Sequence, residues 1–297
     1  MTTIELPPHP ADLPAQPAEP TPSRSMGDAP LPAYESHSSI STYLACPLRY
    51  GFRYVERRPS EVSPGQFAFG NAVHRSFEAF GRARIAAVSG DAPEPRRETL
   101  QGAFDHTIAG CGLAPEEVAA AKRRFAPVLD RFLRREAVAG GRPLGVELGF
   151  DVDVPLPREA TDGTVAIRFV GYIDRVDRAS DGSTVIVDYK TGRLRTQDDV
   201  DADPQLTAYA FGCARGGLRD PATREVLRPA SRLGLYFAEA GELTWTARSD
   251  DQLASFEDRL VETVGRIHAR GFAARPAPWR CRWCEFRNEC PQASPEA

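Results

Sequence analysis

The sequence contains very little lysine, because only Lys122 and Lys190 occur among its 37 basic residues. Wherever the chain needs only a positive charge, it uses arginine instead. A lysine ammonium can be desolvated and have its pKa lowered, whereas an arginine stays charged in proteins. Each lysine is therefore a candidate for a specific chemical role, although sequence drift also accounts for a stray lysine.

Long apolar runs are absent as well, since no stretch approaches the roughly 20 residues that a membrane span needs. The N-terminus has neither a basic region nor an apolar segment, so we expect no secretory signal and a cytoplasmic location. A Gly-x-x-x-x-Gly-Lys-Ser/Thr loop is also missing, which argues against an ATP site in the chain. With 41% hydrophobic and 26% charged residues, the composition is that of a soluble globular protein.

Net charge is confined to the beginning of the chain. The first 35 residues hold nine of the 26 prolines and five acidic residues against one arginine, which accounts for the whole net charge of -4. Such a segment buries too little apolar surface to offset its chain entropy, so we predict a disordered tail over residues 1–35. The remainder has 36 basic and 36 acidic residues, so global charge gives no support for a nucleic-acid partner.

The spacing of apolar residues predicts helices and strands in a mixed order. Helices are expected over residues 36–47, 66–88, 115–137, 204–214 and 250–270. Pro127 should break or kink the third of them. Alternating β-branched residues predict strands over residues 146–154, 165–177, 184–189, 233–237 and 243–247.

This order predicts a single α/β (α+β) domain over residues 36–291, with helices flanking a central mixed sheet. A helical region would cover residues 36–142, the core residues 143–270, and a cysteine-bearing segment residues 276–291. Residues 292–297 would form a second disordered tail.

Acidic and basic side chains converge at one strand end. Side chains alternate along a strand, so Asp188 and Lys190 share a face. The preceding strand returns through a hairpin at Asp181-Gly182, which can bring Asp174 beside Asp188. Two carboxylates beside a lysine can bind Mg²⁺ or Mn²⁺ and activate water for attack on a phosphate. A solvated ion pair at a strand end is the alternative for so short a motif.

Further residues strengthen the first interpretation. His74 follows Gly70 by about one helical turn, although a lone histidine on an apolar helix is more often part of a core. Gln205 and Tyr209 are spaced i, i+4 and so share a helix face. Glu147 opens the first strand and is ambiguous.

These motifs occur in the order Gly70-x-x-x-His74, Gly171-Tyr172-Ile173-Asp174-Arg175-Val176-Asp177, Val187-Asp188-Tyr189-Lys190-Thr191-Gly192 and Gln205-x-x-x-Tyr209. Together they resemble the RecB-type branch of the PD-(D/E)XK nuclease superfamily. The resemblance covers about residues 36–291. It departs from the family name at one position, because Ile173 replaces the proline before Asp174.

The resemblance implies a restriction-endonuclease-like core and a metal-dependent DNA nuclease activity. His74, Asp174 and Asp188 would hold Mg²⁺ or Mn²⁺, with the main-chain carbonyl of Tyr189 assisting and Glu147 as a weaker candidate. Lys190 would be the catalytic lysine. Gln205 and Tyr209 would support the site or contact DNA.

Clustered cysteines suggest a second metal site. Cys281, Cys284 and Cys290 lie close together near the C-terminus, and Cys46, followed like Cys290 by a proline, is the best candidate for a fourth ligand. A cytoplasmic compartment argues against disulfides, and four thiolates suit zinc or an iron–sulfur cluster. Cys111 and Cys213 are expected to be ordinary buried cysteines.

The family resemblance extends to these cysteines. AddB-like nucleases of the RecB type also have one cysteine before the core and three after it, which implies a [4Fe–4S] cluster. Zinc bound by the same four cysteines is the alternative.

Arginines interleaved with aromatic residues flank the cysteines and suit contact with single-stranded DNA. The candidates are Arg49, Arg53, Arg280 and Arg282, and Arg193 and Arg195 just after Lys190. A solvated arginine-rich surface is the alternative.

Two functions are therefore open. One is an exonuclease acting on DNA ends or single strands in repair or recombination, with a separate helicase as a possible partner. The other is a non-catalytic iron–sulfur module that binds DNA within a larger repair complex. The intact set of His74, Asp174, Asp188 and Lys190 favours the nuclease.

Overall fold

The computed structural model describes residues 26, 29–59, 67–138, 141–157 and 163–294. The chain forms two compact units. Unit 1 comprises Met1–Val62, Asp151–Gly171 and Ala254–Ala297, and unit 2 comprises Ser63–Phe150 and Tyr172–Leu253. Most of the predicted tail at residues 1–35, and residues 295–297 of the second predicted tail, lie outside the described residues.

Unit 2 is built on strands that pair in both directions. β4 (Thr184–Lys190) pairs antiparallel with β3 (Ala166–Arg178) and parallel with β5 (Ala230–Phe237). β6 (Glu242–Thr246) pairs antiparallel with β5, and β2 (Arg142–Pro155) pairs with β3. The β3–β4 hairpin turns at Gly182, whose φ of +80° is the left-handed conformation that favours glycine.

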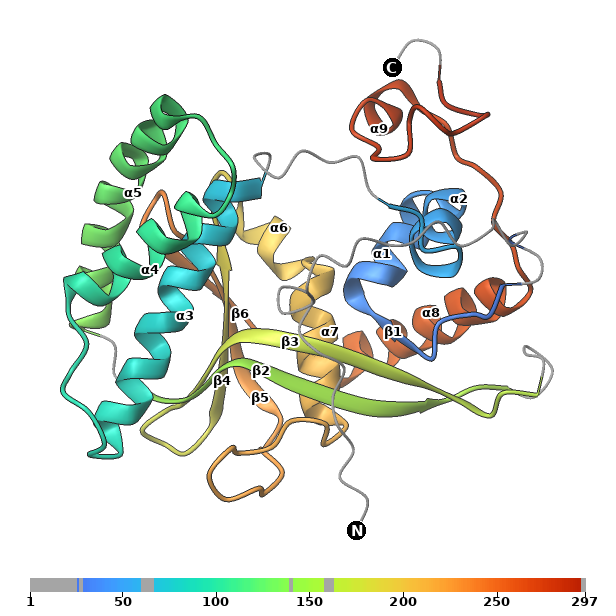
Figure 1. Cartoon of the computed structure of the whole chain (residues 1–297). Coiled ribbons are helices and arrows are strands. Elements are labelled where there is room, and N and C mark those ends of the chain that lie inside the picture. The colour runs from blue at the N-terminus through green and yellow to red at the C-terminus, as the bar shows by residue number, and fades with distance from the viewer. Residues whose placement is uncertain (1–25, 27–28, 60–66, 139–140, 158–162, 295–297) are drawn as a thin grey trace. The chain divides into compact units, whose positions relative to one another are not determined.

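Helices cover this sheet on both sides (Figure 1). α3 (Ala68–Val88), α4 (Arg97–Ala109) and α5 (Pro115–Glu136) pack on one face, where Val185, Val187 and Tyr189 of β4 join their core. The alternate β4 residues, Asp188 and Lys190, contact α7 (Pro204–Ala214) instead. α6 (Gln197–Asp201) precedes α7 in the chain. The sheet therefore separates an aromatic core from a polar site.

Unit 1 collects segments from the beginning, middle and end of the chain. β1 (Tyr34–Ser36) pairs parallel with the first half of β3. Helices follow at α1 (His37–Ala45), α2 (Pro47–Tyr50) and the π-helix η1 (Gly51–Val55). The last segment contributes most of α8 (Asp250–His268) and the short α9 (Pro278–Cys281). Tyr43 OH donates to the Gly271 carbonyl at 2.8 Å, which ties the first segment to the last.

The predicted fold class, helices flanking a central mixed sheet, is confirmed. The predicted break at Pro127 is wrong, because α5 continues through it. Phe125, Val128 and Leu129 around the proline are all buried in the core, and this packing outweighs one lost backbone hydrogen bond. β1 and α4 were not predicted, and the single domain expected over residues 36–291 stays a prediction.

Among the described residues, no helix has the length and apolar character needed to cross a membrane.

A buried carboxyl in unit 1 makes stability depend on pH. Glu35 is the middle residue of β1, and its carboxyl accepts hydrogen bonds from Ser39 and Tyr50. Burial raises the pKa of Glu35 from 4.5 to about 7, although both hydrogen bonds oppose this shift. The folded state thus binds this proton more tightly than the unfolded chain does. The contribution of Glu35 to folding stability is fully present below the pKa of the unfolded chain and is lost as pH rises through about 7.

We therefore expect the free energy of unfolding to fall between pH 5 and pH 8 by about 2 kcal/mol more in the wild type than in Glu35→Gln. The amide has no proton to lose over this range. Urea unfolding of both proteins at the two pH values measures the difference. Parallel pH profiles would show that Glu35 does not titrate differently on folding.

Candidate active site

Asp188 and Lys190 form an ion pair at the end of β4. Asp188 is buried, and its Oδ2 lies 2.7 Å from Lys190 Nζ. The prediction that the two side chains share one strand face is confirmed. Despite this ion pair, Asp188 Oδ2 accepts no hydrogen bond of normal geometry among the described residues. It therefore presents an oxygen that a cation can use.

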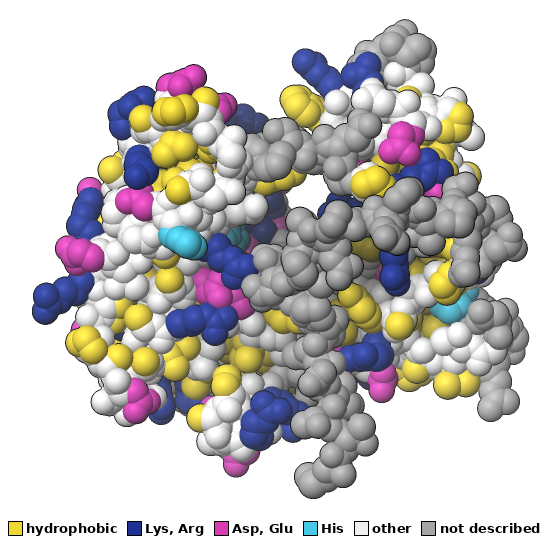
Figure 2. Space-filling model, viewed as in Figure 1, with side chains coloured by type: hydrophobic (Ala, Val, Ile, Leu, Met, Phe, Trp, Pro, Cys, Tyr) yellow, Lys and Arg dark blue, Asp and Glu magenta, His cyan; other side chains and the backbone are white. Residues whose placement is uncertain are grey.

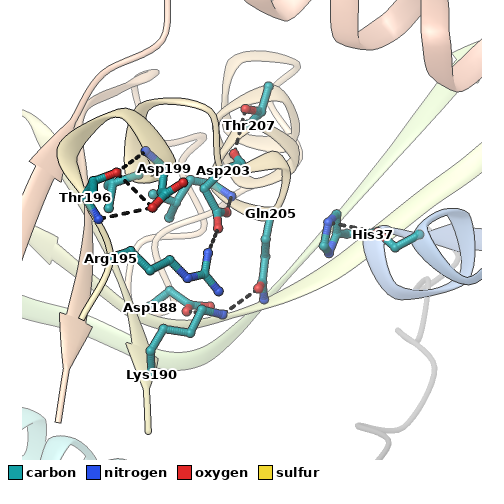
Figure 3. A network of polar contacts seen from close by, with 12 residues as sticks. His37, Asp188, Lys190, Arg195, Thr196, Asp199, Asp203, Gln205 and Thr207 are labelled. Carbon is teal, nitrogen blue, oxygen red and sulfur yellow. Dashed lines mark hydrogen bonds and ion pairs between the residues drawn. The ribbon is translucent and has the colours of Figure 1, made fainter. Parts of the chain in front are cut away.

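The ion pair belongs to a closed ring of polar contacts. Lys190 Nζ donates to Gln205 Oε1 at 2.7 Å, and Gln205 Nε2 donates to Tyr209 OH at 2.6 Å. Tyr209 OH donates to Asp188 Oδ1 at 3.2 Å, which returns the ring to the carboxylate. Figure 3 shows Lys190 pointing toward Gln205, with Asp188 beside it. The four side chains hold one another in a single orientation.

Helix α7 places the two ring residues. Its N-cap is Asp203, whose carboxylate accepts from the Leu206 N–H, and Pro204 occupies the first turn. With this start, Gln205 and Tyr209 lie one turn apart on the face toward β4, as their spacing predicts. Arg195 Nη1 pairs with Asp203 at 2.8 Å and so supports the cap (Figure 3).

Electrostatics keep Lys190 protonated. Burial lowers the pKa of Lys190, but attraction from Asp188 and then Asp174 more than offsets this, so the pKa is raised overall. Burial, followed by the Asp188 charge, raises the pKa of Tyr209 well above its usual value. Both groups are therefore hydrogen-bond donors at neutral pH, and Lys190 acts as a cation rather than as a free base.

A second cluster joins three further side chains. One ligand atom each of His74, Glu147 and Asp174 lie within 4.8 Å of one another. His74 Nδ1 is 3.5 Å from Asp174 Oδ2, which also accepts the Tyr189 N–H at 2.7 Å. This set of an imidazole and two carboxylates is one that a divalent cation can use.

Glu147 is held in an unusual conformation. Its φ of +48° lies in the left-handed region, and it is the only residue of a described strand, glycine aside, with a positive φ. For a non-glycine residue this conformation costs roughly 1–2 kcal/mol. Strain at a carboxylate that meets two other candidate ligands is typical of a functional site. Glu147 is therefore a stronger candidate than its sequence context indicated.

The acidic groups repel one another in this arrangement. Burial raises the pKa of Asp174 well above its usual value, and the charges of Asp188 and Glu147 raise it further. Burial lowers the pKa of His74, which keeps the imidazole neutral and able to bind a metal. A bound cation would relieve this repulsion, so the residues present fit a divalent metal ion.

Helix α3 brings His74 to the strand end. A Cβ at Gly70 would lie only 3.2 Å from Thr191 Oγ1, so the first turn of α3 passes very close to the end of β4. Two turns further, Phe77 packs edge-on against Tyr189, with ring centroids 4.9 Å apart. These two contacts hold the part of α3 that carries His74 against the end of β4.

One supporting residue was missed by sequence reasoning. Arg175 is buried behind β4, where it pairs with Glu136 at 2.6 Å and Asp177 at 2.8 Å. It also hydrogen-bonds the Tyr189 side chain. The motif around Asp174 contains Arg175, but an arginine in a strand gives no sign of whether it faces solvent or a buried acid.

The four predicted cluster cysteines lie together in unit 1, where they line a single pocket. Among the described residues, no three cysteine sulfurs lie within 4.8 Å of one another. Cys111 and Cys213 lie elsewhere, and burial raises the pKa of the Cys213 thiol to about 11. Both hydrogen-bond backbone carbonyls through their sulfurs.

The predicted DNA-contact arginines have different surroundings. Arg49 and Arg53 pair with the buried Glu285 at 2.7 and 3.4 Å, and Arg280 stacks on Trp279. Arg193 lines a groove beside Lys190. On the face of unit 2 seen in Figure 2, basic and acidic side chains are interspersed, as the neutral charge balance suggests.

Comparison with known proteins gives one family. The model of the PD-(D/E)XK nuclease superfamily matches residues 35–291. The chain belongs to this superfamily. In the sequence, Asp188-Tyr189-Lys190 has the (D/E)XK pattern of the superfamily's name.

Among solved structures, 24 chains match this PD-(D/E)XK nuclease. One is the crystal structure of SSO0001, with 13% sequence identity and a TM-score of 0.35 over 77% of this chain and 96% of that chain. No curated protein was found to match.

Proposed function

We propose that the protein is a Mg²⁺- or Mn²⁺-dependent DNA nuclease that hydrolyses phosphodiester bonds at DNA ends or in single strands. The main support is the convergence of His74, Glu147 and Asp174 beside the ring that contains Asp188 and Lys190. A simple surface ion pair needs neither a strained glutamate nor a buried, closed ring.

His74, Asp174 and Asp188 would hold the metal ion, together with Glu147 and the main-chain carbonyl of Tyr189. The ion would polarise the phosphate and lower the pKa of the attacking water. Lys190, held as an ammonium by Asp188 and Gln205, would orient that water and offset the negative charge that builds on the phosphate. Tyr209 would keep Gln205 and Asp188 in place for this role.

The alternative is a non-catalytic DNA-binding module with a relic nuclease fold. Its metal site would be free to degenerate. The strained Glu147 argues against it, because a conformation that costs stability has no use without the site that it completes.

A nuclease assay on single-stranded, duplex and flap DNA tests the proposal. We expect cleavage with Mn²⁺ or Mg²⁺ and none in excess chelator, with the fastest cleavage of substrates that have a single-stranded end. Absence of cleavage from all three substrates with either metal would favour the non-catalytic module.

We also propose that Cys46, Cys281, Cys284 and Cys290 bind a [4Fe–4S] cluster rather than zinc. The pocket that all four cysteines line supports a shared site, and the resemblance to AddB-like nucleases favours the cluster over zinc.

Protein purified without oxygen should then be brown and contain about four iron and four sulfide per chain. Cys284→Ala should lose most of this iron, whereas Cys111→Ala, the control, should keep it. Stoichiometric zinc without iron would overturn the assignment.

A role in DNA repair or recombination, with a separate helicase that unwinds the duplex, completes the proposal. It rests on the proposed single-strand specificity and on the cytoplasmic location expected from the sequence.

A further inference from the structure

Two tryptophans next to the cysteine pocket are unusually exposed. Trp279 is 70% exposed and Trp283 is 67% exposed. Single exposed hydrophobic residues are common, but tryptophan is normally well buried, and here two lie only four positions apart. We call this pair the tryptophan platform. Its exposure is not explained by packing within the chain.

Local structure presents the two rings from successive turns. Trp279 lies in α9, and the Arg282 N–H donates to the Pro278 carbonyl, so the helical path continues to Trp283. Residues spaced i, i+4 along such a path lie on one side, about 6 Å apart along the axis. The platform therefore offers two aromatic faces in sequence rather than one.

An arginine stacks on each ring. The Arg280 guanidinium lies 4.6 Å from the Trp279 ring centroid, and the Arg282 guanidinium lies 5.4 Å from that of Trp283. Arg280 also donates to the Arg275 carbonyl, which fixes its position. These cation–π contacts restrict the rings before any ligand arrives, and so reduce the entropy lost on binding.

The segment beneath the platform is firmly anchored within unit 1. Glu285 pairs with Arg49 and Arg53, and Phe286 packs edge-on against Phe52 with ring centroids 5.6 Å apart. The exposed rings thus stand on an ordered base.

Charge favours a polyanion as the ligand. Residues 275–287 contain four arginines and a single acid, Glu285, which is buried and already paired. Figure 2 shows basic side chains beside exposed hydrophobic ones over α9. Flat aromatic faces with flanking arginines match the bases and phosphates of single-stranded nucleic acid. In a duplex those base faces are stacked inside and cannot reach the rings.

We propose that Trp279 and Trp283 stack on consecutive unpaired bases of single-stranded DNA, while Arg282 contacts the phosphate backbone. This inference rests on the proposed function for the identity of the substrate. The binding itself is separate from cleavage, because the platform lies in unit 1 and the candidate active site in unit 2.

Intrinsic fluorescence can test the proposal, because the chain has only three tryptophans. The third, Trp245 in β6, also has an arginine over its ring, Arg232 at 4.1 Å, but is partly buried. Trp245→Phe is therefore the matched control. In the full-length Trp245→Phe protein all tryptophan fluorescence comes from the platform. Oligothymidylate added without divalent metal ions should quench this fluorescence. The loss of intensity should equal that of the wild type, because Trp245 takes no part in binding.

Binding of a labelled oligothymidylate should weaken about tenfold in Trp279→Ala and in Trp283→Ala, and more in the double variant. Binding of duplex DNA should change less than twofold. Trp279→Tyr with Trp283→Tyr should retain most of the single-strand affinity, because tyrosine keeps an aromatic face. Arg282→Gln should lower the salt dependence of binding by about one ion.

Unchanged oligothymidylate affinity in the double alanine variant would overturn the platform and would point to a protein partner for these rings. An equal loss in the tyrosine variant would overturn stacking as the cause. Tryptophan-dependent binding without any cleavage would leave the platform intact and overturn the nuclease proposal. Normal oligothymidylate binding together with cleavage in the double alanine variant would overturn the platform and leave the nuclease proposal intact.

Discussion

Lys190→Met is expected to reduce DNA cleavage by about a thousandfold, which corresponds to about 4 kcal/mol of transition-state stabilisation. Methionine keeps the length of the side chain but removes the ammonium that faces Asp188 and Gln205. The metal ligands are unchanged, so binding of Mn²⁺ should persist while turnover falls. Initial rates on single-stranded DNA at saturating Mn²⁺ measure the effect.

The chain supplies an unusually clean control for this experiment. Lys122 is the only other lysine, and it pairs with Asp105 on the surface of the α4–α5 region. Lys122→Met should cleave DNA at the wild-type rate. Lys190→Arg preserves the positive charge beside Asp188 and so protects the fold. Its planar guanidinium does not reproduce the ring of polar contacts, so this variant should also cleave DNA slowly. Wild-type activity in Lys190→Met would refute the assigned role.

Glu147→Gln is expected to separate stability from function. The substitution removes a negative charge that acts on Asp174, so in chelator the variant should melt about 2–4 °C above the wild type, as a gain of about 1 kcal/mol predicts. With Mn²⁺ the variant should instead melt below the wild type, because each tenfold loss of metal affinity removes about 1.4 kcal/mol of the stabilisation that the bound metal provides. Cleavage should fall at least tenfold.

Thermal unfolding of both proteins, in chelator and in a Mn²⁺ series, measures these shifts. Asp153→Asn is the matched control, because Asp153 is an exposed acid on the same strand and is not among the three clustered ligands. The control should behave as the wild type under both conditions. Full Mn²⁺ stabilisation of Glu147→Gln would exclude Glu147 from the metal site.

Sequence alone predicted the parts of the site that depend on local geometry. Alternation along β4 placed Asp188 and Lys190 on one face, and helical spacing placed Gln205 and Tyr209 together. Both periods are properties of the backbone, so they can be inferred without knowing the neighbours. The central sheet and most of its helices followed from the same periodicity.

What sequence did not reveal depends on contacts between distant residues. The order of donors and acceptors around the ring requires the register of α7 against β4. The left-handed backbone of Glu147 has no local signal, since glutamate is not a residue that favours it. β1 has only three residues and is too short to show alternation. α4 has only three buried apolar residues, Leu100, Phe104 and Ile108, so its pattern is weak.

The division into two units also has a consequence for how the protein is made. Unit 2 ends at Leu253, whereas unit 1 needs the final segment from Ala254 onward. Synthesis proceeds from the N-terminus, so unit 2, with the candidate active site, is complete before Cys281, Cys284 and Cys290 have been translated. The cofactor proposed for Cys46 and these three cysteines can therefore be inserted only after unit 2 is complete.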